Sequence, residues 1–156
     1  MSFLQRDTLQ AQPQATCFVC GSDNPGGLQL RYECGADGAV NATWTPTSMC
    51  EGFRGIVHGG IVSTVLDEAM SKAVFATNCQ ALTCELRVRF RHHVTVGEPL
   101  RIRGCVVARQ KRKITTEASL CTLDGKERAQ AWATFLVLSG TRGERAALRP
   151  DLASSE

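Results

Sequence analysis

A histidine, two glycines and two adjacent acids lie close together in the segment RGIVHGGIVSTVLDEAM, residues 54–70. Imidazole and carboxylate groups are common general acids and bases in enzymes, and a carboxylate can also act as a nucleophile. Glycines, which lack side chains, let a ligand approach the backbone closely. His58, Gly59, Gly60, Asp67 and Glu68 are therefore the first candidates for a site that does chemistry.

The two glycines stand just before the apolar positions that begin a helix. The first N–H groups of a helix have no partner within it, and the helix dipole makes that end positive. None of the usual capping residues, Ser, Thr, Asp or Asn, stands directly before Ile61. An uncapped helix start with two glycines offers donors for an oxyanion hole, mainly the Gly60 N–H, with His58 in an orienting role. The structural alternative is a tight turn before a closely packed helix.

The helix itself is predicted from residue 61 to about residue 76. Because a helix turns about 100° per residue, Asp67 and Glu68 flank its apolar stripe on opposite sides. Periodicity therefore does not choose between the two acids, and either can be an ordinary solvated or salt-bridged carboxylate. The stripe consists of Ile61, Val62, Val65, Leu66, Ala69, Met70, Ala73 and Val74.

Strand patterns surround this helix. Residues 28–34 and 40–44 alternate apolar and polar positions around the turn GADG, which predicts a hairpin, and residues 45–55 read as irregular. The order β-β-α-β-β-β-β predicts an α+β fold with one long central helix against a curved antiparallel sheet of about six strands. The four strands after the helix are expected at 82–91, 99–109, 113–123 and 128–138.

Composition indicates one globular domain. The chain has 156 residues, with 43% hydrophobic residues, 21% charged residues and a net charge of +3. We expect a flexible arm at 1–16, a single domain at 17–139 and a disordered tail at 140–156. The mild charge argues against a dedicated nucleic-acid binder. No apolar run spans a membrane and no secretory signal begins the chain, so we expect a cytoplasmic protein.

The eight cysteines are expected to be free thiols in a reducing compartment. Cys17 and Cys20 form a CxxC pair, which raises the question of zinc. A structural zinc site needs four ligands, and no second CxxC or Cys–His pair follows at a suitable spacing. A redox CxxC usually precedes a helix, whereas Gly, Asn and Pro follow here. We expect a turn packed against the sheet or near the mouth of the site, with no metal and no cofactor.

Several of these features together resemble the hotdog-fold acyl-CoA thioesterases, in particular the phenylacetate-pathway branch. They are HGG at 58–60, an acid nine residues after His58, a strand with Thr83 and long antiparallel strands. The opening CFVCGSDNPGGLQL at 17–30 is similar to the CxxCGxxNPxGL opening of one subgroup. The resemblance covers roughly residues 17–138. It implies hydrolysis of acyl-CoA thioesters by a homodimer or a dimer of dimers (a homotetramer), with active sites at the dimer interface.

The resemblance also implies roles for individual residues, and it favours the oxyanion hole at the Gly60 N–H over the tight turn. Asp67 is the catalytic acid, as nucleophile or general base, and Thr83 helps to position the water or the carboxylate. Glu68 then pairs with an arginine of the same or a partner subunit, or contributes to the site secondarily. His93 stands where the family often has a proline, which alters the expected channel mouth.

Binding of CoA phosphates requires basic groups near the surface. The candidates are Arg91 and His93 at one strand end, and Arg112 and Lys113 within the cluster RQKRK. Two other function classes remain as alternatives. One is a hotdog enoyl-CoA hydratase or dehydratase, and the other is a non-catalytic acyl-CoA-binding protein.

Overall fold

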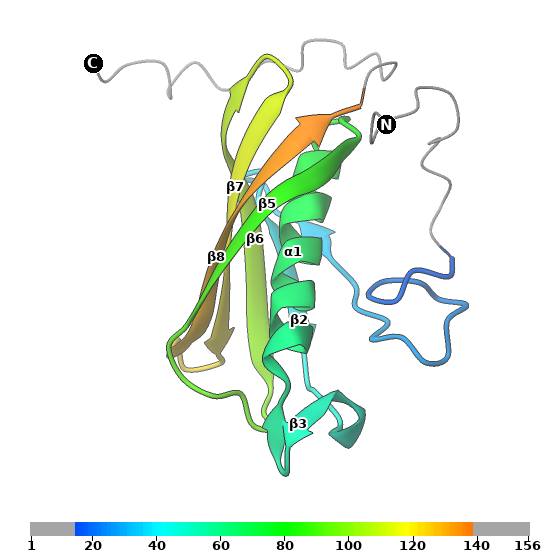
Figure 1. Ribbon diagram of the computed structural model, residues 1–156, viewed down its shortest axis with the longest axis vertical. Helices are drawn as coiled ribbons and strands as arrows, with labels where there is room; N and C mark the ends of the chain where they lie inside the picture. Colours follow the sequence, from blue (N-terminus) through cyan, green and yellow to red (C-terminus); the bar gives the residue numbers. More distant parts are fainter. Residues whose placement is uncertain (1–14, 139–156) are drawn as a thin grey trace.

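The computed structural model describes residues 15–138. Most of the expected N-terminal arm and all of the expected C-terminal tail lie outside the described residues. Within them, one long helix, α1 (Gly59–Phe75), lies across one face of an antiparallel sheet (Figure 1). This confirms the α+β expectation of a single central helix packed on a six-stranded sheet.

The six strands of the main sheet follow the order β1-β2-β6-β7-β8-β5. All five neighbouring pairs are antiparallel. The strand that follows the helix, β5, therefore forms one edge of the sheet. The bounds are β1 (Glu33–Cys34), β2 (Val40–Trp44), β5 (Ala81–Phe90), β6 (Leu100–Gln110), β7 (Lys113–Thr122) and β8 (Glu127–Val137).

The structure differs from the sequence pattern mainly before the helix. Only the last two residues of the expected first hairpin arm form a strand, β1. The stretch expected to be irregular instead contains a short 3-10 helix, η1 (Ser48–Cys50), and a second small sheet of β3 (Glu51–Phe53) and β4 (Ile56–Val57). These strands are too short for an alternating pattern to reveal them. Their hairpin leads directly into the start of α1.

The helix lies close to the sheet because small residues face it. Ala129, Ala131 and Ala133 of β8 are buried beneath it. A Cβ atom on Gly104 of β6 would lie 2.6 Å from the carbonyl oxygen of Ala69, so only glycine fits there. The buried stripe of α1 matches the predicted one, except that Ile61 is only partly buried.

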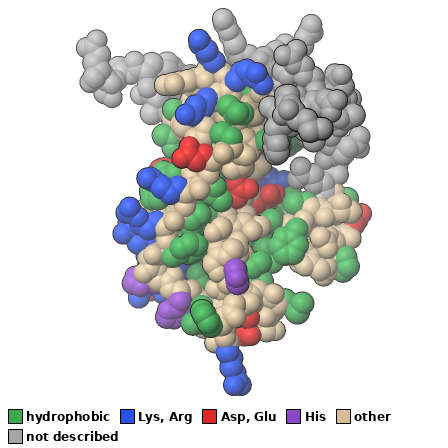
Figure 2. Space-filling view, in the orientation of Figure 1, with side chains coloured by type: hydrophobic (Ala, Val, Ile, Leu, Met, Phe, Trp, Pro, Cys, Tyr) green, Lys and Arg blue, Asp and Glu red, His purple; other side chains and the backbone are tan. Residues whose placement is uncertain are grey.

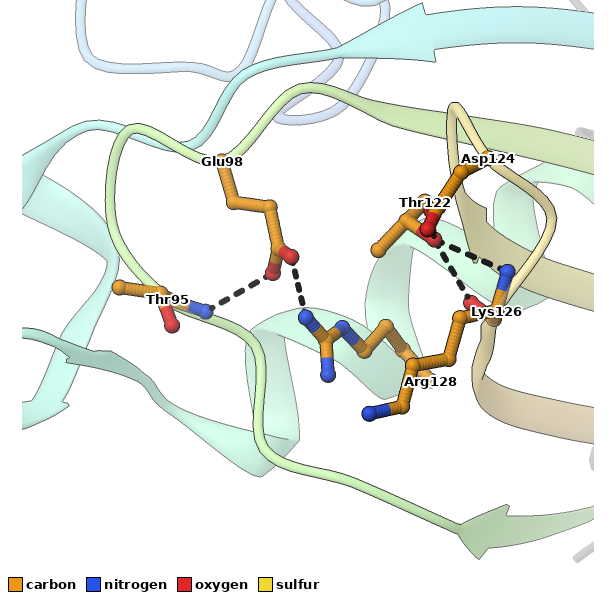
Figure 3. A network of polar contacts seen from close by, with 6 residues as sticks. All are labelled: Thr95, Glu98, Thr122, Asp124, Lys126 and Arg128. Carbon is orange, nitrogen blue, oxygen red and sulfur yellow. Dashed lines mark hydrogen bonds and ion pairs between the residues drawn. The ribbon is translucent and has the colours of Figure 1, made fainter.

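The loop between β5 and β6 supports the start of the helix. Glu98 in this loop forms a mostly buried ion pair with Arg128 at the start of β8, and its other oxygen accepts from the Thr95 N–H (Figure 3). The same loop accepts a hydrogen bond from the Val57 N–H through the Val94 carbonyl, at 2.9 Å. The turn that carries His58 is thus hydrogen-bonded to this loop, and Arg128 of β8 in turn fastens the loop to the sheet.

Candidate active site

The N-terminus of α1 is capped by the side chain of His58. Its Nδ1 atom accepts a hydrogen bond from the Gly60 N–H at 2.9 Å. The expectation of an uncapped helix start was wrong, because imidazole here takes the place of the usual Ser, Thr, Asp or Asn. A Cβ atom on Gly60 would lie 2.9 Å from the same nitrogen, so the glycine makes room for the cap.

This cap leaves a different backbone donor at the helix start. The Gly59 N–H forms no hydrogen bond with any residue in the range 15–138, whereas the Ile61 and Val62 N–H groups both bond to the His58 carbonyl. Gly59 is exposed, and a Cβ atom there would lie 3.5 Å from the ring of Phe90, an ordinary contact. The free donor at the positive end of α1 is therefore that of Gly59.

Asp67 faces β5. The Thr83 hydroxyl donates a hydrogen bond of 2.9 Å to Oδ1 of Asp67. Burial raises the pKa of Asp67, the Thr83 hydrogen bond lowers it, and the nearby charge of Glu68 raises it further. A raised pKa suits a carboxylate that accepts a proton during a reaction.

Glu68 faces the other way, toward the N-terminal segment. Its Oε1 atom lies 3.3 Å from the Lys72 ammonium one helical turn on. Within this chain Glu68 therefore pairs with a lysine and not with the expected arginine. The thiols of Cys17 and Cys20 also approach this carboxylate. Burial raises the pKa of Cys20 to about 12, and the nearby Glu68 carboxylate adds to that rise.

An exposed apolar surface lies beside Asp67, on the helix-facing side of β5. Leu86 pairs with the buried Ala133 across the sheet, and Phe90 pairs with the buried Ala129, yet these two β5 side chains are 39% and 53% exposed. Sequence alternation identified this apolar face but not its exposure, which arises because β5 is an edge strand. Figure 2 shows hydrophobic side chains reaching the surface between a band of Lys and Arg at the left and the N-terminal segment.

Asp67 and the helix start are far apart within one chain. They are separated by eight positions of α1, which corresponds to about 12 Å along the axis at 1.5 Å per residue. A thioester carbonyl is attacked and stabilised within roughly 3 Å of both groups. Asp67 and Gly59 of the same chain therefore cannot act on the same carbonyl group.

The basic candidates for phosphate binding fall into two groups at opposite ends of the sheet. Arg91 and His93 follow the end of β5, near the helix start, and Arg91 forms an ion pair of 3.2 Å with Glu127. Lys113 pairs with Leu136, which also pairs with Leu82 at the beginning of β5. Arg112 donates two hydrogen bonds to the Val137 carbonyl at this same end.

A cavity of about 770 Å³ lies elsewhere, between the segment at residues 28–33 and residues of β2, β6 and β7. It contains none of the candidate catalytic side chains, so it does not bear on the chemistry proposed for Asp67.

All eight cysteines lie in the described range and are free thiols, as expected. Among the described helices, none is long and apolar enough to cross a bilayer.

Known proteins resemble this chain in both sequence pattern and fold. Residues 54–129 match a family model described as the Thioesterase superfamily. A crystal structure of a thioesterase superfamily protein superposes with a TM-score of 0.74 and 29% identity, covering 77% of this chain and 62% of that one. This chain therefore spans less than two thirds of that protein's length. No curated protein matches.

Two more distant structures have the same fold. A hypothetical thioesterase of Streptococcus pneumoniae, solved with coenzyme A, gives a TM-score of 0.66 at 20% identity, covering 75% of this chain and 91% of that one. The PaaI protein of the E. coli phenylacetic acid degradation operon superposes with a TM-score of 0.68 at 18% identity, covering 73% of this chain and 83% of that one. At these identities the likeness concerns the fold alone. The domain has the hotdog fold, and its central part matches the Thioesterase superfamily.

Proposed function

We propose that this protein is a thioester hydrolase that acts on a small or medium acyl-CoA, with Asp67 as nucleophile or general base. The observation that carries the proposal is the hydrogen bond from Thr83 to Asp67 on the open side of the sheet. It orients a half-buried carboxylate with a raised pKa beside an exposed apolar surface. The whole arrangement falls within the residues that match the Thioesterase superfamily.

The site is completed by a second copy of the chain. Asp67 and the helix start are too far apart to share a carbonyl within one chain, as the axial rise of about 12 Å requires. The long edge strand β5 carries exposed apolar side chains, and such edges are normally covered or paired. Antiparallel pairing of two β5 strands in a twofold dimer brings Asp67 of one copy toward the helix start of the other.

The oxyanion donor in this proposal is the Gly59 N–H, and His58 keeps the Gly60 N–H engaged as a cap. Within residues 15–138 the Gly59 N–H has no hydrogen-bond partner, and it is exposed at the positive end of α1. Gly60 then donates its N–H to the His58 cap and, because it has no side chain, leaves room for the imidazole. Loss of one oxyanion donor typically costs about 2.7–4 kcal/mol of transition-state stabilisation.

The same dimer accounts for the two separated basic groups. In an antiparallel β5 pair, the end of one strand lies beside the beginning of the other. Arg91 and His93 of one copy then approach Arg112 and Lys113 of the second, and together they form a phosphate site for CoA. All four basic candidates thus contribute to one phosphate site at the interface between copies. The protein itself is proposed to be cytoplasmic.

Related structures support the pairing of Asp67 with Thr83. Two variants of the S. pneumoniae protein have been solved, one with alanine for an aspartate and one with alanine for a threonine. Those two positions are sixteen apart, which is also the separation of Asp67 and Thr83. That relative was also solved with coenzyme A.

The deciding experiment is thiol release from a panel of acyl-CoAs, measured with a thiol reagent. The proposal expects release of free CoA from at least one substrate by the native chain, and loss of that release in Asp67→Asn with the fold intact. Binding without release would favour an acyl-CoA-binding protein instead. A change at the acyl double bond without release would favour a hydratase.

A further inference from the structure

The N-terminal segment brings two thiols to the buried carboxylate of Glu68. The Sγ atoms of Cys17 and Cys20 and a carboxylate oxygen of Glu68 all lie within 4.8 Å of one another. This segment runs beside α1, away from the sheet (Figure 1). The cluster is thus separate from the Asp67–Thr83 pair, which faces β5.

The backbone around the two cysteines is tightly folded. The Val19 N–H donates to Cys17 Sγ at 3.4 Å, and the Gly21 N–H donates to the Cys17 carbonyl at 2.9 Å. A Cβ atom on Gly21 would lie 2.4 Å from the Cys17 nitrogen, so this turn accepts only glycine. Hydrogen bonds from N–H groups to sulfur stabilise a metal-bound thiolate.

Glu68 contributes a buried acceptor that lacks a hydrogen bond. Its side chain is 14% exposed, and Oε1 is buried without a hydrogen bond from any described residue, although the Lys72 ammonium is 3.3 Å away. The ion pair with Lys72 compensates the charge of this oxygen but leaves its hydrogen-bonding capacity unused, and a buried acceptor of this kind is one place where a protein holds a water molecule or an ion.

We propose that Cys17, Cys20 and Glu68 bind a Zn²⁺ ion, with a water molecule as the fourth ligand. Thiolate ligands select zinc over Mg²⁺ or Ca²⁺. Ligand atoms in a tetrahedral zinc site are roughly 3.8 Å apart for Zn–S bonds of about 2.3 Å, so small side-chain rotations close the present cluster around an ion.

Zinc binding at this cluster releases two protons. Two S–H bonds break and two Zn–S bonds form, and both protons pass to solvent. Two thiolates and one carboxylate then carry three negative charges against the two positive charges of the ion. The Lys72 ammonium beside Glu68 compensates the remaining negative charge.

The bound ion would tie the N-terminal segment to α1. Tyr32 already fastens this region, because its hydroxyl donates to the Val65 carbonyl at 3.1 Å. A zinc link through Glu68 holds the same helix from a second point, one residue from Asp67. This inference concerns metal binding alone, and it holds whether or not the chain hydrolyses thioesters.

The test is a metal titration of the full chain, reduced and stripped of metal. With Co²⁺ we expect one ion per chain and a sulfur-to-cobalt charge-transfer band, which Zn²⁺ then removes. Cys17→Ser/Cys20→Ser should abolish the band. Glu68→Gln should weaken zinc binding at least about tenfold and change the visible cobalt bands, because a ligand and not an outer group is lost.

Matched controls separate this site from the other thiols and acids. Cys34 and Cys84 are exposed, and Cys34→Ser/Cys84→Ser should leave the band unchanged, as should Glu85→Gln. Circular dichroism confirms that each variant is folded. The proposal is overturned if no charge-transfer band forms, if the band survives in Cys17→Ser/Cys20→Ser, or if Glu68→Gln binds zinc like the native chain.

Discussion

The two adjacent acids of α1 lie in opposite surroundings. Asp67 faces β5, where the Thr83 hydroxyl donates to it beside exposed apolar side chains. Glu68 faces the N-terminal segment, where it meets Lys72 and two thiols. The two side chains differ by one methylene group, so any difference in their chemistry comes from what packs around them. The side of the helix, and not the residue type, sets the surroundings of each acid.

The largest expected effect is on Asp67. Asp67→Asn should lower kcat for acyl-CoA hydrolysis by about 10²–10⁴-fold, the usual contribution of a positioned acid–base group. Because burial raises the pKa of Asp67, its ionised form is disfavoured in the folded state, so removing the charge should not lower the melting temperature. Steady-state kinetics and a thermal melt check both statements. Full activity in this variant would end the distinction between the two acids.

A second prediction asks whether the Asp67 side of the helix is completed by another copy. Leu86→Arg places a charge on the exposed apolar face of β5 and should convert the proposed dimer to monomers, with at least a tenfold loss of activity because a site shared between copies would be broken. Sedimentation velocity gives the oligomeric state. Val107→Arg, at an exposed apolar position of β6, is the matched control and should remain dimeric. An active monomer would contradict the shared site.

A third prediction concerns the hydroxyl that orients Asp67. Thr83→Val keeps the shape of the side chain but removes the donor, and should lower kcat about tenfold, the equivalent of roughly 1.4 kcal/mol. Thr83→Ser retains the hydroxyl and should recover most of that loss. If serine and valine behave alike, Thr83 has only a packing role.

A fourth prediction addresses the start of the helix that carries both acids. His58→Ala removes the N-cap and should destabilise the fold by about 1 kcal/mol in urea denaturation. His58→Asn supplies another good capping side chain and should restore that stability. Equal stabilities for alanine and asparagine would show that the imidazole–Gly60 hydrogen bond contributes nothing.

The smallest expected effect is on the Glu68 side. A double-mutant cycle of Glu68→Gln and Lys72→Met, measured with a metal chelator present, should give a coupling of about 0.3–0.5 kcal/mol, typical of such pairs one helical turn apart. Chemical denaturation of the four proteins supplies the cycle. A coupling several times larger would mean that Glu68 acts as a buried ion pair even without metal.

Much of the fold was predictable because it rests on local periodicity. The helix and the four long strands after it were located to within about two residues, since alternation and helical spacing reflect which side chains must be buried. The small β3–β4 hairpin was not, because two or three residues cannot display a period. The exposure of Leu86 and Phe90 was also missed, since an apolar face reads the same on an edge strand and on a central one.

The candidate site divides in the same way. HGG, the spacing of Asp67 and Thr83, and the opposite directions of the two acids were all present in the sequence, because they depend on short separations along one helix and the next strand. The capping of the helix by His58 was not predictable from the sequence, because a histidine gives no clear capping signal and its rotamer depends on the surrounding turn.

By itself, the sequence determined the long helix and the four long strands after it, the stripe of α1 and the identity of the groups that can do chemistry. Only the tertiary structure decided which of those groups meet. It brought Thr83 to Asp67, placed the basic groups at opposite ends of the sheet and carried Cys17 and Cys20 to Glu68. The reason is physical: periodicity records burial along one element, whereas contacts between distant segments depend on how whole elements pack.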